Sequence, residues 1–327
     1  LEMKQAVVDK FARENKLDYG LDQVIICTGA KQALFNVFLA LVNPGDEVIV
    51  PTPCWVTYPA MNDIAEGVLV PIETHLEQHF KITPSQLEAA ITDKTKLLIL
   101  NSPSNPTGSA YSCAELKALG EVLLKHPHVN IISDDIYEHI VWADEPFHNI
   151  LNACPDLKDR TFVVNGLSKA YCITGWRIGY IAGPKDAIAV MKKIQSHQTA
   201  NPCSIAQAAG VAALNGDQSC VHDMCEAFHE RHDFLTGALS NLDGFKVTPS
   251  AGTFYTFANV QAVIDRLPNI QNDLDFAALL LEEAKVAIVP GSAFLAPGYI
   301  RFSYAVNIDT LQQAVDRIHH TLSATPG

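Results

Sequence analysis

Seven short runs of β-branched and other apolar residues alternate with longer helical patterns over the first part of the chain. The runs lie at 24–27, 47–51, 67–72, 96–100, 129–133, 161–165 and 178–183, and helical patterns lie between several of them, at 31–42, 55–67 and 112–126. Continuous apolar strands separated by helices are typical of a mainly parallel sheet that helices cover on both faces. We therefore predict an α/β fold built on a mainly parallel seven-stranded sheet.

The pattern changes near residue 205. Helical segments dominate 204–241, and four short β-rich stretches then lead to a final helical pattern at 308–322. A length of 327 residues suits one large or two moderate domains. We predict a large domain at 1–205 and a smaller C-terminal α+β domain at 206–327.

The charge balance of the chain limits which kinds of molecule it can bind. Asp and Glu number 36 against 23 Lys and Arg, a formal net charge of −13, which disfavours nucleic acid or an anionic membrane as a partner. No apolar run is long enough to span a bilayer. The eight cysteines are scattered, which predicts reduced thiols and a cytoplasmic location. We interpret Cys220, His222, Cys225 and His229 as residues of a half-buried helix and expect no metal site.

Polar and aromatic residues follow five of the β-rich runs where each run ends. In open α/β sheets, ligands bind beyond the carboxyl ends of the strands, so we expect these residues to meet at one edge. In chain order they are Thr28 to Lys31 at the start of a helical pattern, Trp55, Asn105, the group Asp134, Asp135 and Tyr137, and the pair Lys169 and Arg177.

Lys169 and Arg177 lie in an apolar and aromatic stretch, 163–180, that holds no acidic residue. Burying an unpaired ammonium is costly, which suggests that both cations serve a ligand. A dehydrated lysine has a lowered pKa and can attack a carbonyl, and an arginine beside a helix N-terminus can bind phosphate. A carboxylate for a pyridine nitrogen and an indole for the ring complete the requirements of pyridoxal phosphate.

Five motifs resemble those of the class I aminotransferases of fold type I, in that family's order. They are TGAKQALFN at 28–36, NSPSNPTG at 101–108, SDDIYEHI at 133–140, NGLSKAYCITGWRIGY at 165–180 and GYIRFSYA at 298–305. The likeness runs from Leu1 to the C-terminal helix. With PCWVTYPAM at 53–61, it is strongest to the bacterial aspartate aminotransferase subgroup. The resemblance implies a homodimeric enzyme that moves an amino group from an L-amino acid, aspartate first, to a 2-oxo acid such as 2-oxoglutarate.

The resemblance also implies roles for the residues that hold the cofactor. Lys169 forms a Schiff base with pyridoxal phosphate and then acts as general base and acid. Asp134 pairs with the pyridinium nitrogen, and Tyr137 donates to the phenolic oxygen. Asn105 bonds the same oxygen and Trp55 covers the ring, and both also contact the substrate.

The phosphate and the substrate carboxylates have their own implied partners. Arg177 binds the phosphate together with the loop Gly29, Ala30 and Lys31. Arg301 holds the substrate α-carboxylate in a bidentate fork. Lys31 also recognises the distal carboxylate of a dicarboxylic substrate.

The sequence leaves several residue assignments open. Asp135 competes with Asp134 for the pyridinium role, although the family's spacing, an acid three residues before Tyr137, favours Asp134. Arg301 could instead pair with Glu282 or Glu283 in a structural bridge. Trp55 could be a core residue and Lys31 an exposed first-turn lysine, and we interpret Tyr58 and Tyr180 as packing residues.

Other functions stay open beside aspartate transamination. They are an aminotransferase of aromatic or alanine-like specificity, a lyase that uses the same cofactor, and an inactive or regulatory aminotransferase-like module. The motif GxGxxG does not follow the first β-rich run, which disfavours a nicotinamide cofactor. Compared with the family, we expect the sequence to lack the N-terminal segment, which carries a substrate-contacting glycine and a tyrosine that reaches the neighbouring subunit.

Overall fold

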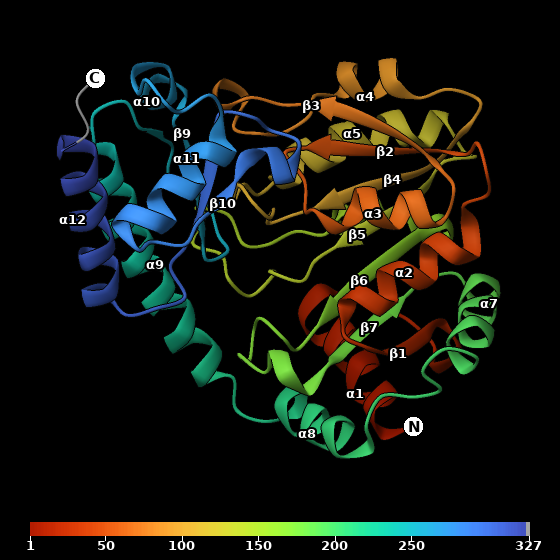
Figure 1. Ribbon diagram of the computed structural model, residues 1–327. Coiled ribbons are helices and arrows are strands. Elements are labelled where there is room, and N and C mark those ends of the chain that lie inside the picture. Colours follow the sequence, from red (N-terminus) through yellow and green to blue (C-terminus); the bar gives the residue numbers. More distant parts are fainter. Residues whose placement is uncertain (325–327) are drawn as a thin grey trace.

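A seven-stranded sheet forms the centre of the first part of the chain in a computed structural model that describes residues 1–324 (Figure 1). Its strand order is β1-β7-β6-β5-β4-β2-β3, and every neighbouring pair is parallel except those that β7 makes with β6 and β1. The predicted α/β class with a mainly parallel sheet is therefore confirmed. The strands are β1 (Val24–Thr28), β2 (Glu47–Thr52), β3 (Val68–Glu73), β4 (Thr95–Asn101), β5 (Asn130–Asp134), β6 (Thr161–Gly166) and β7 (Ile178–Ala182).

Helices cover both faces of this sheet. Alternate residues of a strand point to opposite faces, so Leu97 and Ile99 pack with α2, α3 and α7, whereas Leu98 and Leu100 pack with α1, α4, α5, α6 and α8. The helices are α1 (Glu2–Lys10), α2 (Ala30–Leu41), α3 (Thr57–Ile64), α4 (Pro84–Ala90), α5 (Cys113–Lys125), α6 (Ile150–Ala153), α7 (Lys185–Ser196) and α8 (Ser204–Asn215).

A second, antiparallel sheet organises the C-terminal part, at the left of Figure 1. Its strand order is β10-β11-β9-β8, and four helices pack a separate apolar core against it. The small α+β unit that the sequence predicts is therefore present. Its elements are α9 (Ser219–Ser240), β8 (Lys246–Val247), β9 (Tyr255–Asn259), α10 (Gln261–Arg266), α11 (Asp273–Leu279), β10 (Val289–Pro290), β11 (Tyr299–Ser303) and α12 (Ile308–Ala324).

One predicted helix is shorter than expected, and the first helix of the chain has an additional turn of another type. The helix predicted at 55–67 is shorter, because Trp55 lies in the connection that follows β2. The residue before it, Cys54, donates its N–H to the Phe294 carbonyl at 3.1 Å. The first helix continues beyond Lys10 as one π-helical turn, η1 (Phe11–Asn15), which Lys16 ends in a left-handed conformation.

The structure also bears on membrane-spanning helices and on disulfide bonds. Within residues 1–324, no helix has both the length and the apolar character needed to cross a bilayer. All eight cysteines are free thiols.

Adjacent leucines in α5 provide a test of the assigned faces. Leu123 is fully buried, whereas Leu124 is 43% exposed. Leu123→Ala leaves a cavity, so we expect it to lower the free energy of unfolding by about 2–5 kcal/mol. The matched variant Leu124→Ala should change this free energy by less than about 1 kcal/mol. Urea denaturation measures both variants, and equal losses would contradict the packing described for α5.

Candidate active site

A pocket of about 400 Å³ lies where the carboxyl ends of β4, β5 and β6 face the second sheet. All the site residues predicted from the sequence line this pocket except Gly29, which lies against the side chain of Arg177, a lining residue. The fold therefore brings together residues that are up to 271 positions apart, namely Ala30, Lys31, Trp55, Asn105, Asp134, Tyr137, Lys169, Arg177 and Arg301.

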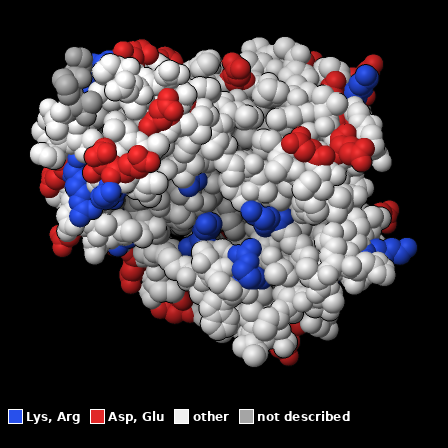
Figure 2. Space-filling model, viewed as in Figure 1, with Lys and Arg blue, Asp and Glu red and all other residues white. Residues whose placement is uncertain are grey.

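Positive charge is concentrated at this pocket. Four of its lining residues, Lys31, Lys169, Arg177 and Arg301, are cations in a chain whose formal net charge is −13. Figure 2 shows Lys and Arg side chains around a hollow in the middle of this face, while Asp and Glu side chains lie towards the periphery. Such a pocket favours an anionic ligand.

Asp134, the last residue of β5, supplies the carboxylate of the pocket. Its Oδ2 accepts a hydrogen bond from the Tyr58 hydroxyl at 2.7 Å. Burial raises the pKa of Asp134 to about 6, although the Tyr58 hydrogen bond acts in the opposite direction. The neighbouring Asp135 turns away, because its carboxylate accepts from Ser133 and Asn149.

Lys169 lies in the loop after β6, with its amine among aromatic rings. Its Nζ is 5.2 Å from the ring centre of Phe254 and 5.8 Å from that of Tyr137. Burial lowers the pKa of Lys169, and the positive charges of Arg301 and Arg177 lower it further. This environment favours a neutral, nucleophilic amine.

Arg177 lies against the start of α2. It adopts a left-handed conformation, with φ of 54°, and its Nη1 donates to the Thr174 carbonyl at 2.8 Å. A Cβ at Gly29 would lie 2.2 Å from its Nη2, so only glycine lets the guanidinium reach the backbone here. The cation and the N–H groups at the start of α2 together make an anion site.

Arg301 enters the pocket from β11 in the second sheet. Its Nη1 donates to Asn105 Oδ1 at 2.7 Å, and its guanidinium lies 4.2 Å from the ring centre of Tyr255. Within the described residues it forms no ion pair with Glu282 or Glu283. Its Nε is buried without a hydrogen-bond partner in that same part of the chain, which leaves a donor for a ligand.

Lys31 and Trp55 lie together at the entrance. The Lys31 Nζ is 5.0 Å from the Trp55 ring centre, and Trp55 meets the Tyr58 ring edge-on. Lys31 is exposed, as the alternative interpretation held, but it also lines the pocket.

Two tyrosines of the pocket are missing from the sequence prediction. Tyr58 was expected only to pack, and the structure corrects this because its hydroxyl bonds Asp134. No local pattern indicates this bond, because Asp134 lies 76 residues away in the sequence. Tyr255, whose hydroxyl lies 3.2 Å from that of Tyr137, had no sequence signal because it comes from the second sheet. Tyr180 does pack, against Phe11.

The hydrogen bond from Tyr58 predicts a pH effect on the protein without ligand. The folded pKa of Asp134, about 6, exceeds the usual 3.8, so its stabilising contribution is complete below pH 3.8 and is lost as the pH rises through 6. Tyr58→Phe removes a donor that favours the carboxylate and raises this pKa. We expect the free energy of unfolding of the variant to keep falling above pH 6, by at most about 1.4 kcal/mol per pH unit.

Chemical denaturation between pH 5 and pH 8 measures the difference from the wild type. Asp134→Asn supplies the control, because it removes the titrating group. Asp134→Asn and the double variant with Tyr58→Phe should therefore show the same pH dependence, and a difference between them would assign the effect to another group.

Comparison with known proteins agrees with this geometry. The sequence profile of the family described as aminotransferase class I and II matches residues 1–318. An aspartate/prephenate aminotransferase from Nitrosomonas europaea is 53% identical over 98% of this chain and 82% of its own. An aspartate aminotransferase from Geobacillus stearothermophilus is 48% identical, over 98% of this chain and 81% of its own. The crystal structure of the aspartate aminotransferase from Rhizobium meliloti matches with a TM-score of 0.95 at 47% identity, over 98% of this chain and 82% of that one. The chain therefore belongs to the class I and II aminotransferases and is a pyridoxal-phosphate-dependent transferase.

Proposed function

We propose that this pocket holds pyridoxal phosphate and transfers the amino group of L-aspartate to a 2-oxo acid such as 2-oxoglutarate. One observation carries the proposal. The lysine amine whose pKa is lowered, Lys169, shares a single pocket with the buried carboxylate of Asp134 and with Arg177 at a helix N-terminus.

The donor set of the pocket fits the cofactor. Arg177, against Gly29 and the start of α2, suits a phosphate, and Trp55 offers a flat face for a ring. Asp134 can hold a proton on a ring nitrogen, while Tyr137 and Asn105 can hydrogen-bond a phenolic oxygen. When bound, pyridoxal phosphate supplies an electron sink that stabilises a carbanion at the substrate Cα.

The protein side of the reaction follows from these positions. Lys169 Nζ is favoured in the neutral form, so it can bind the cofactor covalently and later accept and return a proton. Tyr58 keeps Asp134 oriented by donating to its Oδ2. The aromatic residues Phe254, Tyr137 and Tyr255 exclude water around the amine and the guanidinium of Arg301.

The substrate proposal rests on two cations at different depths. Arg301, with its Nε free to donate and Asn105 beside it, suits an α-carboxylate. Lys31, at the entrance, suits the distal carboxylate of aspartate or glutamate. The names of relatives from Geobacillus stearothermophilus and Rhizobium meliloti, both aspartate aminotransferases, support this choice.

Prephenate is a second candidate acceptor, because the relative from Nitrosomonas europaea carries it in its name. Prephenate is a 2-oxo acid with a second carboxylate on its ring, so it presents the same two charges to Arg301 and Lys31. Reactions with aspartate as the donor and either prephenate or 2-oxoglutarate as the acceptor compare the two directly.

The proposal extends to assembly, location and domain division. We propose a cytoplasmic homodimer. Because Ala206 and Leu214 of α8 pack in the core of the first sheet, we place the domain division after α8 instead of at the 205/206 predicted from the sequence. Exposed apolar side chains such as Trp176 and Ile205, which are 47% and 73% exposed, are of a kind that subunit contacts bury. The free cysteines fit a reducing compartment.

An absorption spectrum tests the proposed function first. We expect the purified protein with pyridoxal phosphate to show a visible band that bleaches when L-aspartate is added, because the amino group moves to the cofactor. Lys169→Ala should lack that band. No band in the wild type would reject the cofactor site. Bleaching by another amino acid alone would reject the substrate, and loss of an eliminated group without pyridoxamine phosphate would indicate a lyase.

The role of Lys31 predicts a change in specificity. Lys31→Ala removes the charge that we assign to the distal carboxylate, so kcat/KM for aspartate should fall about fivefold, as for one solvent-screened ion pair. The value for alanine, which has no distal carboxylate, should stay the same. Steady-state kinetics measure both substrates, and Lys185→Ala, an exposed lysine paired with Asp22, is the control. Equal losses for both amino acids would contradict the assignment.

A further inference from the structure

The turn that follows β5 has two chemically different sides. Asp134 and Tyr137, three residues apart, line the pocket. Asp135 and Glu138, also three residues apart, bond groups outside it. The Glu138 N–H donates to the Asp135 carbonyl at 2.9 Å, so the four side chains belong to one rigid turn. The groups that hold the outer side therefore fix the position of the pocket side.

Glu138 is held by a buried ion pair. Its carboxylate accepts from Lys10 Nζ and, at 2.6 Å, from Asn15 Nδ2, and Lys10 is fully buried. Burial acts to raise the pKa of Glu138, but the charges of Lys10 and His139 and the hydrogen bonds from Lys10 and Asn15 together outweigh it, and the pKa is lowered. Lys10 and Asn15 belong to α1 and η1, so this pair ties the turn to the N-terminal helix.

The same carboxylate also holds the strand that leads to Lys169. Asn165 Nδ2 donates to Glu138 Oε1 at 2.7 Å, and Asn165 Oδ1 accepts from the Gly166 N–H at 2.7 Å. Asn165 lies near the end of β6, four residues before Lys169. Glu138 thus links the turn of Asp134 and Tyr137 to the start of the lysine loop.

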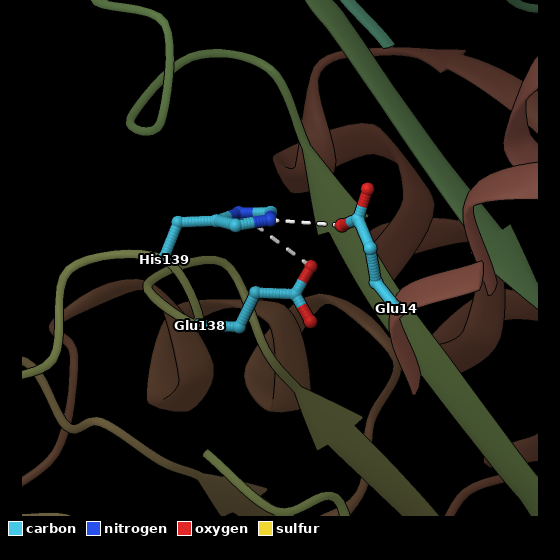
Figure 3. Close-up of side chains that lie close together, drawn as sticks. All are labelled: Glu14, Glu138 and His139. Atoms are coloured by element: carbon cyan, nitrogen blue, oxygen red, sulfur yellow. Dashed lines mark hydrogen bonds and ion pairs between the residues drawn. The ribbon is translucent and has the colours of Figure 1, made fainter. Parts of the chain in front are cut away.

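The surroundings of Glu138 offer a metal site as the rival explanation. Glu14, Glu138 and His139 have ligand atoms within 4.8 Å of one another, and Figure 3 shows the His139 ring facing both carboxylates, with a dashed line to each. His139 Nε2 lies 3.0 Å from Glu14 and its Nδ1 lies 3.7 Å from Glu138. The ammonium of Lys10, however, already contacts Glu138 and lies 3.6 Å from Glu14. A cation from the protein itself supplies the countercharge, so these residues do not need a metal ion.

We propose that Glu138 is a positioning residue of the amino-transfer site. Paired with Lys10 and bonded to Asn165, it fixes the position of the Asp134–Tyr137 turn relative to the loop after β6 that carries Lys169. This inference rests on the proposed function for its effect on the cofactor, but not for its effect on the two segments.

Glu138→Gln tests the inference in two measurements. The amide keeps the shape, but it leaves the buried Lys10 ammonium with only the more distant carboxylate of Glu14, at 3.6 Å, and it places an N–H₂ group opposite other donors. We expect the dissociation constant of pyridoxal phosphate to rise about tenfold. This is the lower end of the loss in affinity seen in metal sites when the hydrogen-bond partner of a metal-binding side chain is removed. In the protein without cofactor, hydrogen exchange at 133–140 and 165–171 should become faster in both segments together.

Glu14→Gln is the matched control. It removes a neighbouring carboxylate that contacts Lys10 and His139 but neither Asn165 nor the turn's partners in β6. We expect it to lower Tm while the cofactor's dissociation constant and the exchange at 165–171 stay within twofold of the wild type. A change equal to that of Glu138→Gln would overturn the proposal.

The double variant Lys10→Met with Glu138→Gln separates positioning from stability. Without the buried ammonium that has lost its nearest carboxylate, it should regain Tm, yet its dissociation constant for pyridoxal phosphate should stay raised. A constant that recovers together with Tm would show that Glu138 acts only through overall stability and would overturn the proposal. If the wild type itself bound no pyridoxal phosphate, the proposed function would fail instead, and hydrogen exchange would still decide the role of Glu138.

Discussion

The close approach of two backbones, at Gly179 in β7 and at the start of α2, governs the geometry of the site around Arg177. A Cβ at Gly179 would lie 2.2 Å from the Ala30 nitrogen, so no other residue fits there without moving α2. Because β7 runs antiparallel to β6, the chain from Lys169 to Arg177 turns at the same sheet edge as Asp134. The antiparallel strand of this sheet, β7, thus begins at the edge where the parallel strands end, and Arg177 directly before it lies at that edge.

Burial gives this edge its chemistry. The carboxylate of Asp134 and the amine of Lys169 both lose solvation, which moves their pKa values towards each other, upwards for the acid and downwards for the amine. Both pKa values therefore lie closer to neutral pH than they do in water, which suits groups that hold and move protons. The two arginines reinforce the effect on the amine, and they also leave anion sites at the two ends of the pocket.

The sequence predicts the parts of the site that local rules control. Apolar runs mark the strands, and the residues after them, such as Asp134 and Lys169, reach one edge because parallel strands end there. Contacts between distant segments carry no such local signal. Tyr255 meets Tyr137 only because the second sheet folds over the first, and Lys10 meets Glu138 across 128 residues. Lys10 also lies outside every motif that carries the resemblance to the family, so the sequence gives no indication of its contact with Glu138.

One continuous segment connects the Asp134 side of the pocket with the Arg301 side. After Glu138, residues 140–142 pair with the chain that leads into β9, through Thr253 N–H to the Ile140 carbonyl at 2.9 Å and Trp142 N–H to the Ala251 carbonyl at 3.0 Å. Two residues after Thr253 comes Tyr255, which lies against both Tyr137 and Arg301. The turn that carries Asp134 is therefore held by α1 on one side and joined to the second sheet on the other. These contacts connect Asp134, in the turn after β5, with Arg301, in the second sheet, and so constrain the spacing between the two side chains across the pocket.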